Sequence, residues 1–261
     1  MGVVPPHSAA QVDVFRLPEG RSHPDELAVE EPLEIRIGGE PIAVTMRTPG
    51  HDEELALGFL HTEGFHPRSA AAPADLAANT VEVELEAPID PERVRRNFYT
   101  SSSCGVCGKG AIEAVRVEAP PVESDLRIPF DVIASLPARL LGGQGTFAAT
   151  GGLHATGLFD PAGELLCLRE DVGRHNAMDK VVGWALIHSL LPLAGSVLCV
   201  SGRLSFELVQ KAAVAGCPVV VAVGAPSTLA VELACDLGVT LCGFVRGGRV
   251  NVYSEPWRVT A

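Results

Sequence analysis

Two cysteines three residues apart are the side chains of this sequence best suited to covalent chemistry. Cys104 and Cys107 stand in 101-SSSCGVCGKG-110, beside Lys109. The thiolate is the reactive form of cysteine, and a nearby cation with free backbone N–H groups lowers the pKa of a thiol. Such a pair can pass on sulfur or close a local disulfide. The segment lacks hydrophobic periodicity, which predicts a mobile loop around both cysteines.

Other uses of this pair are less favoured. A structural zinc site needs a second ligand pair, whereas the other five cysteines stand singly in apolar patterns typical of small buried side chains. These are Cys167, Cys199, Cys217, Cys235 and Cys242. A thioredoxin-like motif opens a helix after a strand, whereas Gly follows each cysteine here. The remaining alternative is a surface loop whose cysteines have no function.

Basic residues gather in three other segments that could bind an anion. Arg174 and His175 belong to 169-REDVGRHNAMDK-180, Arg203 to 201-SGRLSFE-207, and two more arginines to 244-FVRGGR-249. Helix N-termini and the carboxyl ends of strands are common anion-binding places. Each segment alone could be an ordinary solvated turn. Because all three follow strands of one predicted sheet, together they predict a shared pocket for an anionic ligand. A further histidine, His154 at the start of a strand, we interpret as structural.

The elements that position these segments form an α/β fold. From residue 130 the predicted order is α-β-β-α-β-α-β-α-β-β, and the near-continuous apolar strands indicate a sheet covered on both faces. Earlier, 33–46 reads as a hairpin around Gly38-Gly39, 52–64 as a helix and 81–86 as a strand. We therefore expect an irregular segment over 1–30, with at most one short strand at 11–16. A smaller α+β part follows over 31–125 and contains the Cys loop at 101–110. A three-layer α/β/α domain over 126–261 completes the chain.

This order of elements is shared with the zinc-dependent cytidine deaminases. Those enzymes place H-x-E or C-x-E, and then P-C-x-x-C, at the starts of two consecutive helices. Here 174-RHNA-177 has the histidine without the glutamate, and 201-SGRLSFE-207 has no cysteine. The sequence therefore predicts a cytidine-deaminase-like core without deaminase activity and without a bound metal.

Composition narrows the class of partner. With 20 basic and 32 acidic residues the net charge is −12, and 47% of the residues are hydrophobic. The hydrophobic content excludes a disordered chain. The negative charge makes nucleic acid and anionic membranes unfavourable binding partners. The longest apolar stretches, such as 217–226, are too short to cross a bilayer, and the N-terminus lacks a secretion signal. An odd number of cysteines in such a chain favours a reducing cytoplasm.

Five motifs, in order, closely resemble one family, the formate dehydrogenase accessory sulfurtransferases (FdhD). They are 101-SSSCGVCGKG-110, 151-GGLHATGLFD-160, 169-REDVGRHNAMDK-180, 201-SGRLSFELVQKA-212 and 243-GFVRGGRVNVYS-254. The resemblance covers roughly residues 30 to 255. It implies a cytoplasmic homodimer that accepts sulfur from a cysteine desulfurase as a cysteine persulfide. The sulfur then passes to the bis(molybdopterin guanine dinucleotide) cofactor of molybdenum, or of tungsten, before the cofactor enters formate dehydrogenase.

The resemblance also assigns residues. Cys104 and Cys107 would handle the sulfur, and either could carry the persulfide. The cofactor would lie against Phe244, Val245, Arg246, Gly247, Gly248 and Arg249. Our own interpretation of the residues adds Arg174, His175 and Arg203 to this pocket, and it predicts that GDP and GMP bind there as fragments of the cofactor. Asp171 or Asp179 could accept a hydrogen bond from the guanine amino group. Two other functions stay open: a thiol-disulfide oxidoreductase and a non-catalytic cofactor-binding chaperone.

Overall fold

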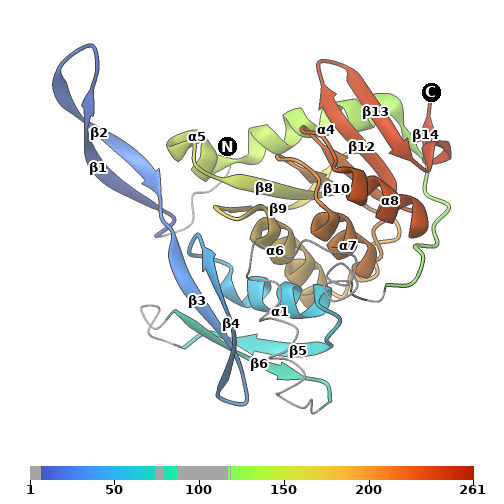
Figure 1. The fold of residues 1–261 in the computed structure, drawn as a ribbon, viewed down its shortest axis with the longest axis horizontal. Coiled ribbons are helices and arrows are strands. Elements are labelled where there is room, and N and C mark those ends of the chain that lie inside the picture. Colours follow the sequence, from blue (N-terminus) through green and yellow to red (C-terminus); the bar gives the residue numbers. More distant parts are fainter. Residues whose placement is uncertain (1–6, 74–78, 88–116, 118) are drawn as a thin grey trace.

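A six-stranded sheet forms the centre of the computed structural model, which describes residues 7–73, 79–87, 117 and 119–261 (Figure 1). Its strand order is β13-β12-β11-β10-β8-β9, with parallel pairing between β10 and β11 and between β11 and β12. The strands are β8 (His154–Phe159), β9 (Leu165–Asp171), β10 (Val197–Val200), β11 (Val219–Ala222), β12 (Thr240–Arg246) and β13 (Arg249–Ser254). Every residue of β10 and β11 is buried, as their apolar runs predict.

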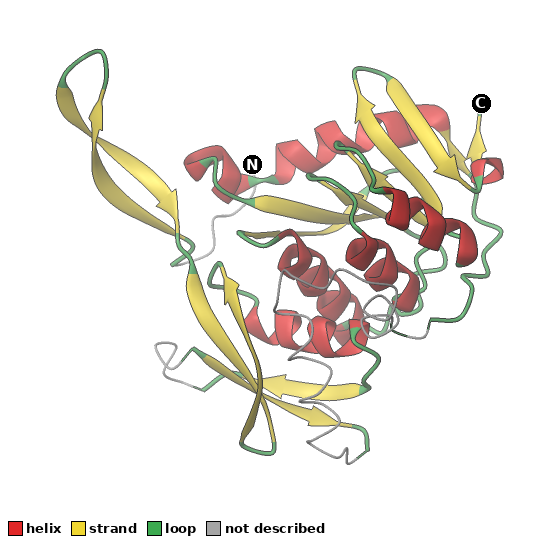
Figure 2. Ribbon diagram, in the orientation of Figure 1, coloured by secondary structure: helices red, strands yellow, loops and turns green. Residues whose placement is uncertain are grey.

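Helices cover both faces of this sheet (Figure 2). Helix α4 (Phe130–Gly143) packs on one face through Ile133, Leu136 and Leu140. Helices α6 (Arg174–Ile187), α7 (Phe206–Val214) and α8 (Thr228–Asp236) share a second core on the other face. The predicted α/β class and the covered sheet are therefore present. The specific likeness to cytidine deaminases stays a prediction.

A smaller sheet precedes the large one in the chain. Its order is β4-β3-β6-β5, and helix α1 (Asp52–Thr62) packs on it. The strands are β3 (Glu31–Ile37), β4 (Glu40–Arg47), β5 (Pro67–Ala71) and β6 (Thr80–Leu85). Gly38 and Gly39 make the expected hairpin turn, with φ of 61° and 81° that glycine adopts without strain. Shorter elements are α5 (Gly145–Thr150), β7 (Ile128–Pro129), a 3₁₀ turn (Pro256–Arg258) and β14 (Val259–Thr260).

The N-terminal segment differs from the prediction. Residues 1–30 were expected to be irregular, with at most a short strand at 11–16. Instead β1 (Ala9–Arg16) and β2 (Arg21–Ala28) form an antiparallel hairpin that projects from the body of the molecule (Figure 1). None of the residues in these two strands is fully buried. The first strand contains the alternation that predicted 11–16, whereas 21-RSHPDELA-28 has no apolar alternation from which the second strand could be inferred.

Two of the helices have uncommon features. Helix α4 continues through Pro137, because the buried side chains on either side hold both halves on the sheet. Helix α6 begins at Arg174 with Gly173 as its N-cap and without a side-chain cap. The Cys loop at 101–110 lies outside the described residues.

The two sheets are joined by a close crossing of α1 and α6. A Cβ atom added at Gly58 would lie 1.8 Å from the backbone oxygen of Asp179. One added at Gly183 would lie 1.8 Å from the backbone oxygen of Glu54. The two helix backbones are thus in direct contact, and no residue with a side chain fits at either position.

We predict that Gly183→Ala, which places a methyl group inside the backbone of α1, destabilises the protein by about 3 kcal/mol or more. Gly142→Ala is the matched control, because a Cβ at Gly142, near the end of α4, meets nothing within 4 Å. That control should be neutral or slightly stabilising. Urea denaturation measures both, and equal stabilities of the two variants would contradict the crossing.

Candidate functional site

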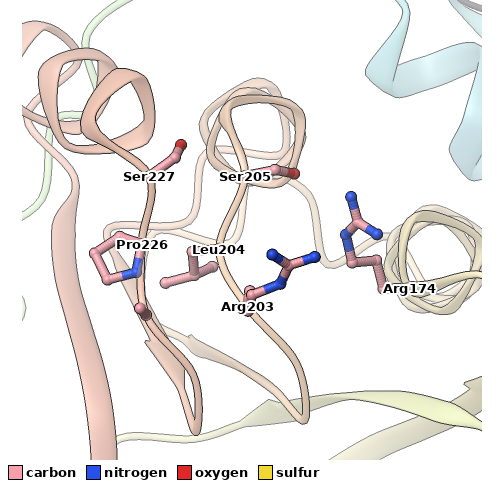
Figure 3. A pocket seen from close by; sticks show the side chains of 7 residues that line it. Arg174, Arg203, Leu204, Ser205, Pro226 and Ser227 are labelled. Carbon is pink, nitrogen blue, oxygen red and sulfur yellow. The ribbon is translucent and has the colours of Figure 1, made fainter. Parts of the chain in front are cut away.

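A pocket of about 350 Å³ opens where three helices begin (Figure 3). It lies beyond the carboxyl ends of the parallel strands β10 and β11, where ligands bind in open α/β sheets. The lining residues come from the start of α6 and from the two loops that lead into α7 and α8. They are Arg174, Arg203, Leu204, Ser205, Ala225, Pro226 and Ser227.

Ser205 precedes α7 and Ser227 precedes α8 at this pocket, and their hydroxyl groups make different hydrogen bonds. Ser227 Oγ accepts a hydrogen bond from the backbone N–H of Ala230, 3.2 Å away, as an N-cap should. Ser205 makes no such capping bond, and its Oγ lies 3.3 Å from Nε2 of His175 instead. The start of α7 is therefore tied to the start of α6 through side chains.

Arg174 and Arg203 are the charged residues that line the pocket. Within the described part of the chain, neither forms an ion pair or a hydrogen bond to another residue. Arg47 and Arg169, by contrast, are held by carboxylates at 2.5–3.2 Å. Two guanidinium groups that point into one pocket without carboxylate partners leave it strongly positive, which favours an anionic ligand.

His175 also lies beside the pocket, but unlike the two arginines it has a carboxylate partner. Its Nε2 lies 3.5 Å from Oε2 of Glu207, in the first turn of α7. The hydrogen bond with His175 is the main reason that the pKa of Glu207 falls to about 2, although partial burial opposes it. Glu207 therefore stays ionised across the neutral range and balances part of the positive charge beside the pocket.

The structure also brings His154 to this group of residues, a placement that the sequence interpretation missed. Its ring packs against Gly202, where an added Cβ would lie 3.4 Å from Nδ1. Burial lowers the pKa of His154, and the positive charges of Arg174 and His175 lower it further. The sequence feature that could have indicated this placement is the position of His154 at the start of a strand. In the structure, that position pairs His154 with Asp171 at the end of β9.

The suggestion that Asp171 or Asp179 reads a guanine is wrong. Asp171 is fully buried, and its carboxylate lies 2.7 Å from Nζ of Lys180. Asp179 is also buried and lies 2.9 Å from Nζ of Lys211. Both carboxylates are already paired in the interior, so neither can face a ligand in the pocket.

The segment 244–249 borders the pocket without being among its lining residues. The backbone N–H of Phe244 donates to the oxygen of Gly224 at 3.0 Å, next to the loop that carries Pro226. Phe244 is exposed and has a φ of 52°, which is rare for a residue with a side chain. Val245 is buried in the core. The hairpin tip holds Gly247 and Gly248, flanked by the exposed side chains of Arg246 and Arg249.

Cys104 and Cys107 lie outside the described residues. The chain re-enters the described structure at Val117, whose N–H donates to Oε1 of Gln210 on α7 at 2.9 Å. Among the other cysteines the prediction of burial fails for Cys235, which is exposed. Cys167, Cys199, Cys217 and Cys242 are buried as expected. Burial raises the pKa of all four thiols, to about 12 for Cys167, Cys217 and Cys242.

Among the described residues, no three side chains of His, Cys, Asp or Glu are grouped in a way that could hold a metal ion. The helices in the described ranges are also too short or too polar for any of them to cross a membrane.

Comparison with known proteins places this chain in one family. The chain is 49% identical to the sulfur carrier protein FdhD of Streptomyces coelicolor, over 94% of each chain. It is 44% identical to the protein of the same name from Sulfolobus acidocaldarius, over 95% of this chain and 98% of that one. A crystal structure of a candidate formate dehydrogenase accessory protein from Desulfotalea psychrophila superimposes with a TM-score of 0.76 at 28% identity, over 97% of this chain and 98% of that one. The sequence profile of the FdhD/NarQ family matches residues 28–260. The chain belongs to the FdhD/NarQ family.

Proposed function

We propose that this protein is a sulfur carrier that serves formate dehydrogenase. In this proposal Cys104 or Cys107 accepts sulfur from a cysteine desulfurase as a persulfide. The acceptor of that sulfur is the bis(molybdopterin guanine dinucleotide) cofactor of molybdenum or tungsten, bound as a substrate before it enters formate dehydrogenase. Its relatives are named sulfur carrier proteins, which supports the first part. We further propose that the protein works as a cytoplasmic homodimer.

The observation that carries the cofactor part of the proposal is the pair of pocket arginines that have no ion-pair partner among the described residues. Arg174 and Arg203 lie together in an otherwise acidic protein, beside the first turns of α7 and α8. A pyrophosphate needs such paired guanidinium groups and free N–H groups. The hairpin tip with Arg246 and Arg249 adjoins this pocket through Gly224, so it can extend the positive surface along a long dinucleotide.

The position of Val117 supports a link between the cysteine segment and the pocket. Its hydrogen-bond partner Gln210 lies three residues after Glu207 on α7, which is about one helical turn. Glu207 in turn contacts His175 beside the pocket. The segment that carries both cysteines therefore rejoins the described structure about one turn of helix from the pocket wall.

Loading of sulfur should depend on the Cys104–Cys107 pair alone. We expect the protein, incubated with a cysteine desulfurase and cysteine, to gain sulfur mass that dithiothreitol removes. The double variant Cys104→Ser/Cys107→Ser should gain none, because four of the remaining thiols are buried and have raised pKa values. The fifth, Cys235, is exposed but has no second cysteine three residues away. Intact-mass spectrometry makes the measurement.

Cys235→Ser is the matched control for that experiment. Cys235 lies on α8 and is exposed. Among the cysteines that the structure describes, it is therefore the one that a desulfurase could reach. Loss of loading in Cys235→Ser, with loading kept in the double variant, would overturn the assignment. A reversible Cys104–Cys107 disulfide that turns over with thioredoxin would instead favour an oxidoreductase. Full formate dehydrogenase activity in cells with the double variant would favour a chaperone.

Binding of the nucleotide should depend on the pocket and not on the cysteines. One charge-assisted contact contributes about 1.5–3 kcal/mol, so Arg203→Ala and Arg249→Ala should each weaken GDP binding roughly 10- to 150-fold. Both should leave sulfur loading unchanged. Arg68→Ala, at an exposed position of β5, removes the same charge elsewhere and should change neither property. Calorimetry with GDP tests this, and wild-type affinity in Arg203→Ala would exclude the pocket.

A further inference from the structure

His154 stands beside the pocket without a hydrogen-bond partner among the described residues. It is the first residue of β8, and its half-buried ring rests on Gly202, immediately before Arg203. An imidazole in such a position has two ring nitrogens, of which at least one carries a proton to donate. A partly buried donor without a protein partner suggests that a bound ligand completes its hydrogen bonding.

The charges that face His154 come from several elements. Arg174 and His175 at the start of α6 act on it as positive charges, and Asp171 on β9 acts as a negative charge. Glu207 on α7 pairs with His175, and Asp171 pairs with Lys180, so both carboxylates are already engaged by other groups. Arg203 follows Gly202 and lines the same pocket. In the protein without ligand, His154 therefore sits among cations, which oppose a further positive charge on its ring.

An anion placed between the two arginines would reverse this balance. The charges of Arg174 and Arg203 would be neutralised, and a nearby oxyanion would accept a hydrogen bond from the imidazole and favour its charged form. A pyrophosphate carries enough negative charge to engage both arginines and the histidine together.

We infer that His154 is a ligand-binding residue of this pocket and that it takes up a proton when a nucleotide pyrophosphate binds there. The inference rests on the proposed function of the pocket. It adds His154 to the residues that bind the nucleotide, and it adds the uptake of one proton to the binding reaction. Binding is then coupled to pH through one identified side chain.

The sign of the coupling follows from linkage. The pKa of His154 lies below its ordinary value in the free protein and rises in the complex. The contribution of His154 to affinity is then fully present at pH values below the pKa of the free protein. It declines as pH rises between the two values, and it is absent above the pKa of the complex. Each unit of difference between the two pKa values corresponds to about a tenfold change in Kd.

Calorimetry with GDP on the whole protein, as wild type and as His154→Gln, tests the inference. Titrations at pH 7 in buffers of different ionisation enthalpy give the number of protons exchanged on binding. We expect net uptake by the wild type and markedly less uptake by His154→Gln. The terminal phosphate of GDP also titrates near pH 6, so the difference between the two proteins isolates the histidine.

The affinity for GDP, measured at several pH values, is a second test of the inference. The wild type should bind GDP about three- to tenfold more tightly than His154→Gln at pH 6, and the two should converge by pH 8. His188→Gln is the matched control, because His188 is an exposed histidine at the other end of α6. It should match the wild type at every pH.

The outcomes separate the inference from the function on which it rests. If the wild type does not bind GDP, the proposed pocket is wrong and the inference fails with it. If the wild type binds GDP with the same proton uptake and the same pH profile as His154→Gln, the pocket stands and the role of His154 is excluded. If His154→Gln lowers affinity equally at pH 6 and pH 8, the histidine contributes shape or packing and the proton coupling is overturned.

Discussion

The contact between the backbones of α1 and α6 is the constraint on which the arrangement of the molecule depends. Gly58 and Gly183 allow the two helices to touch, and this fixes the small sheet against the large one. It also fixes the depth at which α6 lies and therefore where Arg174 and His175 emerge at its start. Any side chain at either glycine would push the helices apart and move one wall of the pocket.

Buried ion pairs stabilise the same crossing by joining α6 to β9, to α7 and to residues at both ends of α1. Lys211 on α7 reaches Asp179 on α6 and the hydroxyl of Thr62 on α1, each at 2.9 Å. Lys180 on α6 reaches Asp171 on β9 at 2.7 Å and the backbone oxygen of Thr48, before α1, at 2.8 Å. Because a buried charge that loses its partner is costly, these pairs tolerate few alternative arrangements. Two of the three lysines of the sequence are thus structural, whereas Arg174 and Arg203 in the pocket form no ion pair with any residue that the structure describes.

The large sheet could be predicted because its central strands are continuous apolar runs and one of its helices, α8, follows a clear cap, Ser227. The convergence of Arg174, His175 and Arg203 also followed from the sequence, since loops after neighbouring strands of one sheet meet at one edge. The roles of Asp171 and Asp179 were misjudged, because burial and pairing with Lys180 and Lys211 depend on contacts between residues far apart in sequence. For the same reason the sequence did not place His154 beside Arg174 and His175. In the exposed hairpin β1–β2, the first strand has a short apolar alternation that predicted it, whereas the second strand has none.

The connection between Glu86 and Val117, which includes both cysteines of the pair, begins and ends on fixed points. Glu86 N–H donates to the oxygen of His66 at 2.9 Å, and Val117 is held on Gln210. The first anchor adjoins the end of β6 in the small sheet, and the second lies on α7, which packs on the large sheet. The crossing of α1 and α6 therefore also sets the distance between the two ends of this connection.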